Sequence, residues 1–521
     1  MIKKISSPLL ILLVFFILLS GNKTYSSNVK QTLKDNPILK IAFPSLKNAS
    51  HYEPTKIQFL YEYLFLDNIY STLIEINPKG QLAPAIAEKF FWEGNNLHLI
   101  IRSDIKSQNG TPITAQDVEF SLKRLLILSE KTKNTHGNFK DLLDPNIYLG
   151  TIEENCTAIR STQTEVILRV KGSKHFLLPM LTSIDFVIIP KSSIDPLTLE
   201  IINYKETSGL YYVHHDNKDG NITLKINPYH FHASENLAQT IKLIPFDLTD
   251  PNKALELFDK GDVDHLTICN GTNIENLVKY SANHPDTQIY STLKIKKFML
   301  VFTERGQQEL TIAQRRWIGK QIRDCIPLLY QNQTIYDSTD QFFIEDGYAA
   351  LTKEELIELN NIEITQVPLQ KFRIGLIGTA NANLWKEPIQ LKISEATVYQ
   401  EFHLPDLHNY NNLNEMPHAF IGGTEAGYIE DINLITYNLN VGIFGLNKSE
   451  REKWLIDYMK TEDSMLRTKI LSNLHYQALK DAICVPLVAC PYTAIVRKPW
   501  HMTLSNLFPD NHVWLIKQIP S

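Results

Sequence analysis

One stretch, residues 80–124, constrains the fold more than any other part of the chain. After a turn at Asn77–Gly80 come the amphipathic segment APAIAEKF, the strand-like run LHLIIR and a second turn at Asn109–Pro112. Thr114 then stands as a helix N-cap with Asp117 three residues later. An apolar stripe with helical spacing follows, formed by Val118, Leu122, Leu125 and Leu126. Strand and helix signals this close together predict a mixed α and β class.

The composition agrees with a globular protein of this class. Of 521 residues, 43% are hydrophobic and 21% charged, which excludes a disordered, collagen-like or multi-span membrane chain. Short β-rich runs, such as Ile38–Phe43 and Ile222–Asn227, alternate with helical stretches. The net charge of -5 disfavours nucleic acid as a partner, since phosphate binding needs a basic face.

The N-terminus has the pattern of a secretory signal peptide. Lys3 and Lys4 precede an uninterrupted run of eleven apolar residues, Leu9–Leu19, and small polar residues follow. Eleven residues are too few to span a bilayer, which takes about 20. We therefore expect residues 1–26 to be a signal peptide, with an uncleaved anchor as the alternative. The first cysteine is Cys156, so no cysteine near the junction could carry a lipid.

The stretch at residues 80–124 resembles the extracytoplasmic solute-binding proteins of family 5, which bind oligopeptides and dipeptides for ABC importers. That family carries a "P.lAesw" helix, a strand and a "DGtPvtAeDv.fslkR" turn and helix, matched here by Gly110–Pro112, Asp117 and Arg124. Further segments match in the same order. They are SGLYYV (208–213), NPYHF (227–231), KALELFDKGDVDHL (253–266), FMLVFTERG with QRRWIGKQIRD (298–324) and VPLVACPYTAIVRKPW (485–500).

The resemblance, which is strongest to the oligopeptide-binding protein, implies an α/β, periplasmic-binding-protein-like fold with two lobes and an extra subdomain on lobe I. Lobe I would comprise residues 27–50, 185–295 and 485–521. The subdomain would comprise residues 51–184, and lobe II residues 296–484. Two chain crossings would form a hinge that lets the lobes close over a ligand.

The same resemblance implies the function and the partners. We expect a periplasmic, monomeric binding protein that captures oligopeptides or peptide-like solutes and delivers them to ABC importer permease subunits. It would perform no chemistry, need no cofactor and bind no nucleic acid. The motifs H-E-x-x-H, G-x-S-x-G and G-x-x-x-x-G-K-[ST] are absent from the sequence.

The candidate ligand-binding residues follow from the family's way of holding an extended peptide between strands of both lobes. In lobe II the family's "agW.aDy.dp" loop corresponds to IGGTEAGYIEDI (421–432). The candidates there are Gly422, Gly423, Thr424, Glu425, Gly427 and Tyr428. The glycines could form an anion nest, but close approach of the ligand backbone is the preferred interpretation. In lobe I the candidates are Pro44, Ser45, Leu46 and Lys47.

Gly427 stands where the family has the aspartate that pairs with the peptide's α-ammonium. A desolvated ammonium without a counter-charge costs several kcal/mol. Glu425, Glu430 or Asp431 could replace that aspartate; Glu425 would share a strand face with Gly427. The alternative is a ligand without a free amine.

Lobe II departs from the family a second time after the strand RIGLIGT. NANLWKEP is too short for the usual long helix, and we expect Pro388 to end it. Lobe II would then be trimmed there.

Histidines and cysteines give weaker signals. His230 and His232 could present two imidazoles on one strand face as metal ligands, with His214 and His215 nearby, but ordinary surface histidines are favoured. Cys484 and Cys490 would share one face of a strand as small buried hydrophobes, and the odd count of five cysteines leaves at least one unpaired.

Three other functions remain open at this point. The fold could serve a ligand sensor or interaction protein that does not transport. It could carry a metal chelate or haem. An extracytoplasmic hydrolase is the least favoured, because no nucleophile and base are placed together in the sequence.

Overall fold

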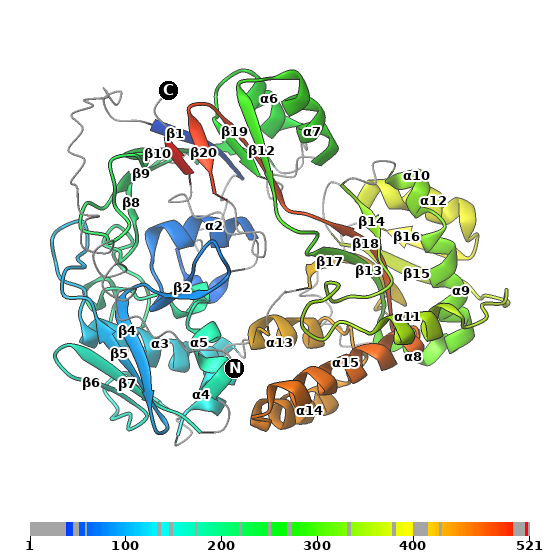
Figure 1. Ribbon diagram of the computed structural model, residues 1–521, viewed down its shortest axis with the longest axis horizontal. Helices are drawn as coiled ribbons and strands as arrows, with labels where there is room; N and C mark the ends of the chain where they lie inside the picture. Colours follow the sequence, from blue (N-terminus) through cyan, green and yellow to red (C-terminus); the bar gives the residue numbers. More distant parts are fainter. Residues whose placement is uncertain are drawn as a thin grey trace, which may run out of the picture. The chain divides into compact units, whose positions relative to one another are not determined.

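A computed structural model of the chain gives the fold (Figure 1). It describes residues 38–44, 52–57, 60–132, 137–144, 149–171, 174–217, 220–247, 252–267, 274–330, 335–377, 382–399, 415–426, 430–503 and 516–518. The expected signal peptide lies outside them. None of the described helices combines the length and the apolar character that a membrane crossing requires.

Lobe I is built around a seven-stranded sheet with the order β12-β19-β11-β1-β10-β9-β8. β1 pairs in parallel with β10 and β11, and the other pairings are antiparallel. The strands are β1 (Ile38–Pro44), β8 (Tyr211–Asp216), β9 (Ile222–Ile226), β10 (Thr240–Phe246), β11 (His265–Thr267), β12 (Thr287–Ser291) and β19 (Thr493–Arg497). Helices α6 (Lys253–Asp259) and α7 (Ile274–Asn283) pack on this sheet through Ala254, Phe258 and Leu277. The β-rich runs of the sequence therefore became β1 and β9, as expected.

The second part of lobe I is built around a four-stranded sheet with the order β4-β5-β7-β6. Its helix α3 (Ala115–Thr132) begins at the predicted cap, because the Thr114 backbone N–H donates to Asp117 Oδ2 at 2.8 Å and the Asp117 N–H to Thr114 Oγ1 at 3.3 Å. The strands are β4 (Ala87–Glu93), β5 (Asn96–Ile101), β6 (Ile159–Ser161) and β7 (Glu165–Arg169). The remaining helices of lobe I are η1 (Pro54–Lys56), α2 (Leu60–Ile69), α4 (Gly137–Leu142), η2 (Lys174–Phe176), α5 (Leu177–Met180), η3 (Ile184–Phe186) and η4 (Lys191–Ser193). Two two-stranded sheets complete it: β2 (Ile74–Ile76) pairs with β3 (Leu82–Pro84), and β20 (Trp500–Met502) pairs with β21 (Ile516–Gln518).

The segment APAIAEKF is strand rather than the helix that the family resemblance implied. Leu82–Pro84 pairs with β2, and Ala87–Glu93 pairs antiparallel with β5. In β4 the partly buried Phe90 and Trp92 pack against the core, and the intervening Phe91 is exposed. This alternation of buried and exposed side chains suits a half-buried strand. The segment APAIAEKF therefore pairs as strand, although its own pattern of apolar residues is amphipathic.

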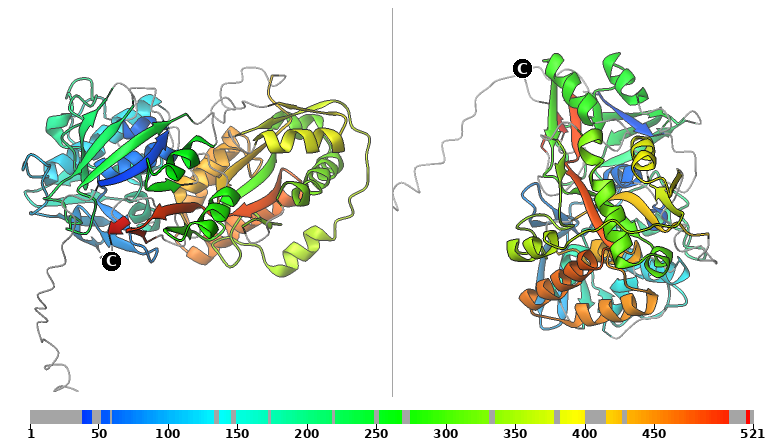
Figure 2. Two further views of the ribbon diagram at one scale, coloured as in Figure 1. Left: turned by 90° about the horizontal axis from the view of Figure 1, so that it is seen from above. Right: turned by 90° about the vertical axis from the view of Figure 1, so that its right-hand side faces the viewer.

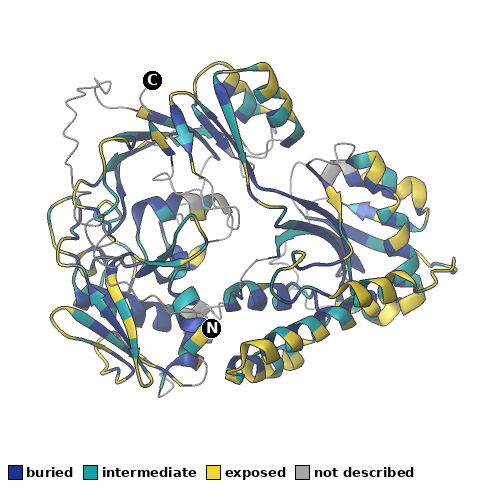
Figure 3. Cartoon of the chain, in the orientation of Figure 1, coloured by how far each residue is buried: buried dark blue, intermediate teal, exposed yellow. Residues whose placement is uncertain are grey.

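Lobe II is built around a six-stranded sheet with the order β14-β18-β13-β17-β15-β16. Side chains of β13 alternate: Phe298, Leu300 and Phe302 face one buried cluster, and Met299 and Val301 face another. The strands are β13 (Lys296–Phe302), β14 (Asp337–Ser338), β15 (Phe372–Leu376), β16 (Ala396–Tyr399), β17 (Ala419–Glu425) and β18 (Cys484–Cys490). Figure 3 shows buried residues along these strands and exposed residues on the outer faces of the helices.

Helices cover both faces of the lobe II sheet. The cluster with Phe298 takes side chains from α9 (Ile312–Arg323), α10 (Ile326–Leu329) and α12 (Ala382–Lys392). The cluster with Met299 takes side chains from α13 (Ile432–Asn440), α14 (Lys448–Lys460) and α15 (Ser464–Lys480). The two shorter helices are α8 (Glu304–Glu309) and α11 (Lys353–Asn360). Both faces of the central strands are therefore buried.

The chain passes from the lobe I sheet to the lobe II sheet between β12 and β13, and returns between β18 and β19. Figure 2 shows the green strands β12 and β13 running beside the red strands β19 and β18. Hydrogen bonds tie the two crossings together: the Thr292 N–H donates to the Tyr492 carbonyl, and the Tyr492 N–H to Thr292 Oγ1, each at 2.9 Å. Two short adjacent connections are what a hinge between lobes requires.

The expectation that Pro388 ends its helix is wrong. Helix α12 runs from Ala382 to Lys392 with Pro388 inside it, and leads into β16, which pairs in parallel with β15. Proline removes one backbone donor from a helix. The helix persists because Trp385 and Ile389, 1% and 0% exposed, anchor it against the sheet, and Trp385 Nε1 donates to the Tyr330 hydroxyl at 3.2 Å.

Cys484 and Cys490 lie on opposite faces of β18, contrary to the prediction. Opposite β13 the register jumps from Val488 to Pro486, which leaves Leu487 as an extra residue. A bulge of this kind reverses the alternation of the side chains. Cys484 faces the cluster of Met299, whose Sδ lies 3.6 Å from its Sγ, and Cys490 faces the other cluster. Among the described cysteines, Cys156, Cys325, Cys484 and Cys490 are all buried free thiols, which agrees with the interpretation as small hydrophobes.

Candidate functional site

The structure describes half of the residues proposed from the sequence as ligand contacts. Pro44 is the last residue of β1, in the middle of the lobe I sheet. Gly422 to Glu425 form the end of β17, between β13 and β15. Ser45, Leu46, Lys47, Gly427 and Tyr428 lie outside the described residues.

The two glycines of β17 are closely approached by side chains of lobe II itself. A Cβ on Gly422 would lie 3.2 Å from Ile377 Cδ1, and one on Gly423 would lie 3.1 Å from the Phe298 ring. Both contacts are tighter than ordinary van der Waals distances. Packing within lobe II is therefore enough to explain why glycine stands at both positions, without a ligand backbone close by.

Of the three carboxylates that could replace the missing aspartate, Glu425 has a partner within the hinge region. The Tyr492 hydroxyl, next to β19, donates to Glu425 Oε1 at 2.8 Å. Glu425 ends β17 and lies opposite Lys296 of β13. The neighbouring Thr424 hydroxyl donates to Asn438 Oδ1 on α13 at 3.1 Å. The end of β17 is thus bonded to both a hinge crossing and a helix.

Glu430 is bound within a buried cluster. Arg467 of α15 donates to both of its carboxylate oxygens, at 2.8 and 3.1 Å, and the Tyr458 hydroxyl donates at 2.8 Å. His175 Nε2 lies 2.9 Å from Glu430 Oε2. Burial acts to raise the pKa of Glu430, but the hydrogen bonds from these partners lower it to about 2. Glu430 is therefore ionised at neutral pH and already neutralised by Arg467.

Asp431 follows directly and has different surroundings. It is the N-cap of α13, and its Oδ1 accepts the backbone N–H of Asn433 at 2.8 Å. Burial raises the pKa of Asp431, and the nearby Asp185 raises it further. Asp431 is among the residues that line two cavities. Of the three carboxylates, Asp431 is the one whose ionised form would gain most from a cationic group of a ligand.

The larger cavity, of about 220 Å³, lies between the lobes. Among the described residues, Asp431 is the one from lobe II that lines this cavity. The other lining residues belong to lobe I and lie mainly in α2, around β2, at residues 179–184 and in the turn after β9. Apart from two tyrosines, its ionisable lining residues are Asp67, Glu75, His230, His232 and Asp431. No lysine or arginine occurs among the described residues that line it. The cavity is thus acidic in character.

Two histidines of this cavity are held in fixed positions. His230 is 5% exposed; its Nδ1 accepts the backbone N–H of His232 at 3.2 Å, and its Nε2 lies 2.9 Å from Ser71 Oγ. Burial lowers the pKa of His230 well below its usual value, so the ring is neutral. His232 Nε2 lies 2.9 and 3.0 Å from the two oxygens of Glu75. The expectation of surface histidines is therefore wrong for His230, which is buried in the wall of a cavity, whereas it holds for the exposed His215.

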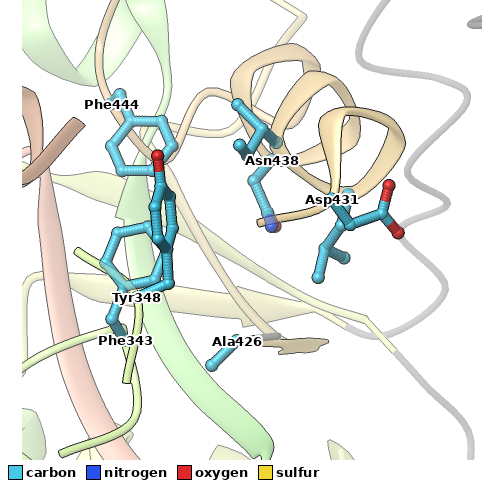
Figure 4. A pocket seen from close by; sticks show the side chains of 8 residues that line it. Phe343, Tyr348, Ala426, Asp431, Asn438 and Phe444 are labelled. Atoms are coloured by element: carbon cyan, nitrogen blue, oxygen red, sulfur yellow. The ribbon is translucent and has the colours of Figure 1, made fainter. Parts of the chain in front are cut away.

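The smaller cavity, of about 10 Å³, lies inside lobe II (Figure 4). Phe343, Tyr348 and Phe444 form one wall, and Asn438 of α13 and Asp431, the N-cap of that helix, form another. In Figure 4 the Asp431 carboxylate points away from the aromatic rings. A space of this size holds about one water molecule at most. It is a packing gap beside α13 rather than a ligand site.

Sequence reasoning did not foresee most of this cavity. Asp67 and Glu75 had no motif around them, and Asp431 was one of three alternatives. His230 and His232 were noted only for their spacing. In the structure they meet because the turn after β9 folds back against the segment between α2 and β2, which places residues 71 and 230 in contact. Of the signals in the sequence, only the histidine pair and the candidate Asp431 pointed to this cavity.

Among the described residues, no three histidine, cysteine, aspartate or glutamate side chains are grouped as metal ligands. The Ser71 and His230 pair could be taken for a nucleophile and its base. Because His230 Nδ1 accepts a backbone N–H, the neutral ring carries its proton on Nε2 and donates to Ser71 Oγ. A ring in this tautomer cannot take the serine proton.

Two large sheets joined by a pair of adjacent crossings, with a cavity lined from both sides, are the two-lobe fold of periplasmic binding proteins. Residues 81–305 match the sequence profile described as "Bacterial extracellular solute-binding proteins, family 5 Middle". No curated protein matches the sequence.

Solved structures share the fold over nearly the whole chain. The Haemophilus influenzae OppA complex with RPPGFSPFR is 15% identical, covers 94% of this chain and 100% of its own, and has a TM-score of 0.68. The Escherichia coli murein tripeptide binding protein MppA is 13% identical, with coverages of 93% and 99% and a TM-score of 0.71. Brucella suis NikA in complex with Fe(III)-EDTA is 13% identical, with coverages of 93% and 100% and a TM-score of 0.72.

Proposed function

We propose that the chain is an extracytoplasmic substrate-binding protein that captures oligopeptides or peptide-like solutes and delivers them to an ABC importer. The observation that carries this proposal is the acidic cavity of about 220 Å³ whose walls come from both lobes. A ligand there touches both lobes at once, so its binding energy favours closure. The fold shared with the peptide-bound OppA supports a peptide as the ligand class.

Asp431 is the proposed counter-charge for the ligand's ammonium group. Gly427 has no side chain to supply it, and Glu430 is neutralised by Arg467 at 2.8 Å. Asp431 lies in the cavity wall with a pKa raised by burial, so an ammonium group nearby stabilises its charged form. The strand end from Gly422 to Glu425 and residues Pro44 to Lys47 would then hold the ligand backbone.

Closure would take place about the two crossings, at residues 291–296 and 490–493. The lobe and subdomain bounds given from the sequence are part of this proposal, except that residues 485–490 lie in β18 of the lobe II sheet rather than in lobe I. Residues 1–26 would direct the chain to the periplasm and be removed, and the permease subunits would receive the ligand from the closed form. Capture and delivery require no catalysis, and the Ser71 and His230 tautomer argues against a hydrolase.

A metal-chelate ligand is the second candidate. NikA, which shares the fold, was solved with Fe(III)-EDTA. Here His232 lines the cavity, as an imidazole that could contact a chelated metal. Its contact with Glu75 at 2.9 Å competes with such a role.

The test is native mass spectrometry of the protein purified from the periplasm of a producing cell, with the released ligand sequenced. We expect a mass added by peptides bearing a free amine. A bound metal chelate or an amine-free solute as the sole ligand would contradict the peptide assignment.

A further inference from the structure

A short helix of lobe I contacts lobe II away from the hinge. In η2, His175 Nε2 lies 2.9 Å from Glu430 Oε2. The next residue, Phe176, has its ring centre 5.8 Å from that of Tyr458, and the Arg467 guanidinium lies over the Phe176 ring at 5.1 Å. One helical turn of lobe I thus meets a charged and aromatic surface of lobe II.

The lobe II side of this contact is held together by bonds within lobe II. Arg467 donates to the carbonyls of Thr461 and Glu462, at 2.8 and 2.7 Å, as well as to Glu430. Tyr458 donates to Glu430 and shares a short hydrogen bond with Tyr348. These bonds need no partner from lobe I, so this surface is already assembled before the lobes meet.

The contact is separate from both the hinge and the ligand cavity. Neither His175 nor Phe176 is among the residues lining the cavity. In the chain, η2 comes between β7 of the four-stranded sheet and β8, far from both crossings. Phe176 and Tyr458 are each 1% exposed and belong to one buried cluster. Because the contacting atoms belong to different lobes, the contact forms only when the lobes approach.

We propose that residues Lys174–Phe176 are a closure latch that docks on Glu430, Tyr458 and Arg467 and stabilises the closed form with or without a ligand. His175 is its positioning residue: it touches no ligand, yet it sets how often the lobes are closed. The effect on ligand affinity rests on the proposed function, whereas the effect on the empty protein does not.

The size of the effect follows from the exposure of His175. Its side chain is 49% exposed, and contacts of this kind change an equilibrium about two- to fivefold. When the empty protein is mostly open, the apparent dissociation constant of the ligand rises by the same factor as the closed fraction falls. The reason is that the ligand is held by the closed form.

The test measures the distance between the lobes by electron resonance between two spin labels. The labels replace two leucines of different lobes, Leu197→Cys and Leu391→Cys, which are 91% and 80% exposed. The variants are His175→Ala and His175→Gln, whose amide can still donate to Glu430. His215→Ala, an exposed histidine at the end of β8, is the matched control.

Without ligand, the ratio of closed to open molecules should fall about two- to fivefold in His175→Ala, while His175→Gln and His215→Ala stay near the wild type. The thermal unfolding midpoint should stay unchanged, which a merely structural role would not predict. An unchanged distance distribution in folded His175→Ala overturns the latch. If no peptide binds any variant but the distances still shift, the proposed function fails and the latch stands.

Discussion

The Arg467 guanidinium donates to both carboxylate oxygens of Glu430, at 2.8 and 3.1 Å, from a side chain that is 1% exposed. The next residue, Asp431, has no guanidinium partner in the part of the chain that the structure describes, and it lines the cavity between the lobes instead. Two adjacent acids therefore have separate tasks. Glu430 is bonded within lobe II, and Asp431 is the proposed counter-charge for a ligand.

The substitution Asp431→Asn tests the second task. Asparagine keeps the N-cap of α13, because its side-chain oxygen can still accept the Asn433 N–H. It removes the negative charge, so we expect affinity for a peptide with a free amine to fall about 10- to 100-fold. Affinity for the N-acetylated form of the same peptide should change little. Calorimetric titration of both peptides measures the difference.

Glu425→Gln is the matched control for this experiment. Glu425 accepts from the Tyr492 hydroxyl at 2.8 Å, a bond that glutamine can also accept. Equal losses in the two variants, or a loss only in Glu425→Gln, would contradict the assignment of the ammonium to Asp431.

The pKa of Glu430 predicts a pH dependence of stability. Its folded pKa, about 2, lies below its usual 4.5. A carboxyl with a lowered folded pKa stabilises the fold above the unfolded pKa, and the stabilisation is lost as the pH falls from about 4.5 to about 2. The difference in unfolding free energy between the wild type and Glu430→Gln should therefore shrink across this window. Denaturant unfolding at several pH values measures it.

At neutral pH, Glu430→Gln should lower the unfolding free energy by about 3 kcal/mol, because it leaves the Arg467 charge buried without its counter-charge. Glu354→Gln, which replaces an exposed acid in the first turn of α11, is the control. A Glu430→Gln protein that stays as stable as this control would show that the buried ion pair is not formed.

Pro388→Ala should stabilise α12. The proline lacks the N–H that would donate to the carbonyl of residue 384, in a helix that continues to Lys392. Alanine restores this donor and has the highest helix propensity, so we expect a gain of about 1 kcal/mol in unfolding free energy. Thermal and denaturant unfolding would show it. A loss of stability would mean that a proline bend fits α12 to the sheet.

The cysteines predict a clear pattern of thiol reactivity. Burial raises the pKa of Cys484 to about 12 and that of Cys490 to about 11, and it also raises the pKa values of Cys156 and Cys325. A buried neutral thiol is a poor nucleophile. In a Cys269→Ser variant we expect no reaction with a disulfide reagent at pH 8, and four reacting thiols after unfolding. Rapid labelling of the folded variant would contradict the packing described here.

Local signals in the sequence predicted local structure well. The cap at Thr114 and Asp117 marked the start of α3 within a residue, and the apolar runs at residues 38 and 222 marked β1 and β9. Each depends on residues within a few positions of one another. The periods of apolar residues and the capping pattern contain that information directly.

Features that depend on distant partners were misjudged or missed. The extra residue Leu487 in β18, which places Cys484 and Cys490 on opposite faces, depends on the register with β13. Pro388 stays inside a helix because Trp385 is anchored against residues far away in the sequence. The cavity joins residues near positions 70, 180, 230 and 431, and no single window of the sequence contains more than a part of it.

The most direct test of the central claim is calorimetric titration of a mixture of tri- to pentapeptides onto protein that was unfolded and refolded to remove any bound ligand. The account predicts saturable binding at one site per chain, with a smaller radius of gyration in solution scattering of the bound form. No binding of any peptide, together with saturable binding of a solute that lacks an amine, would contradict it.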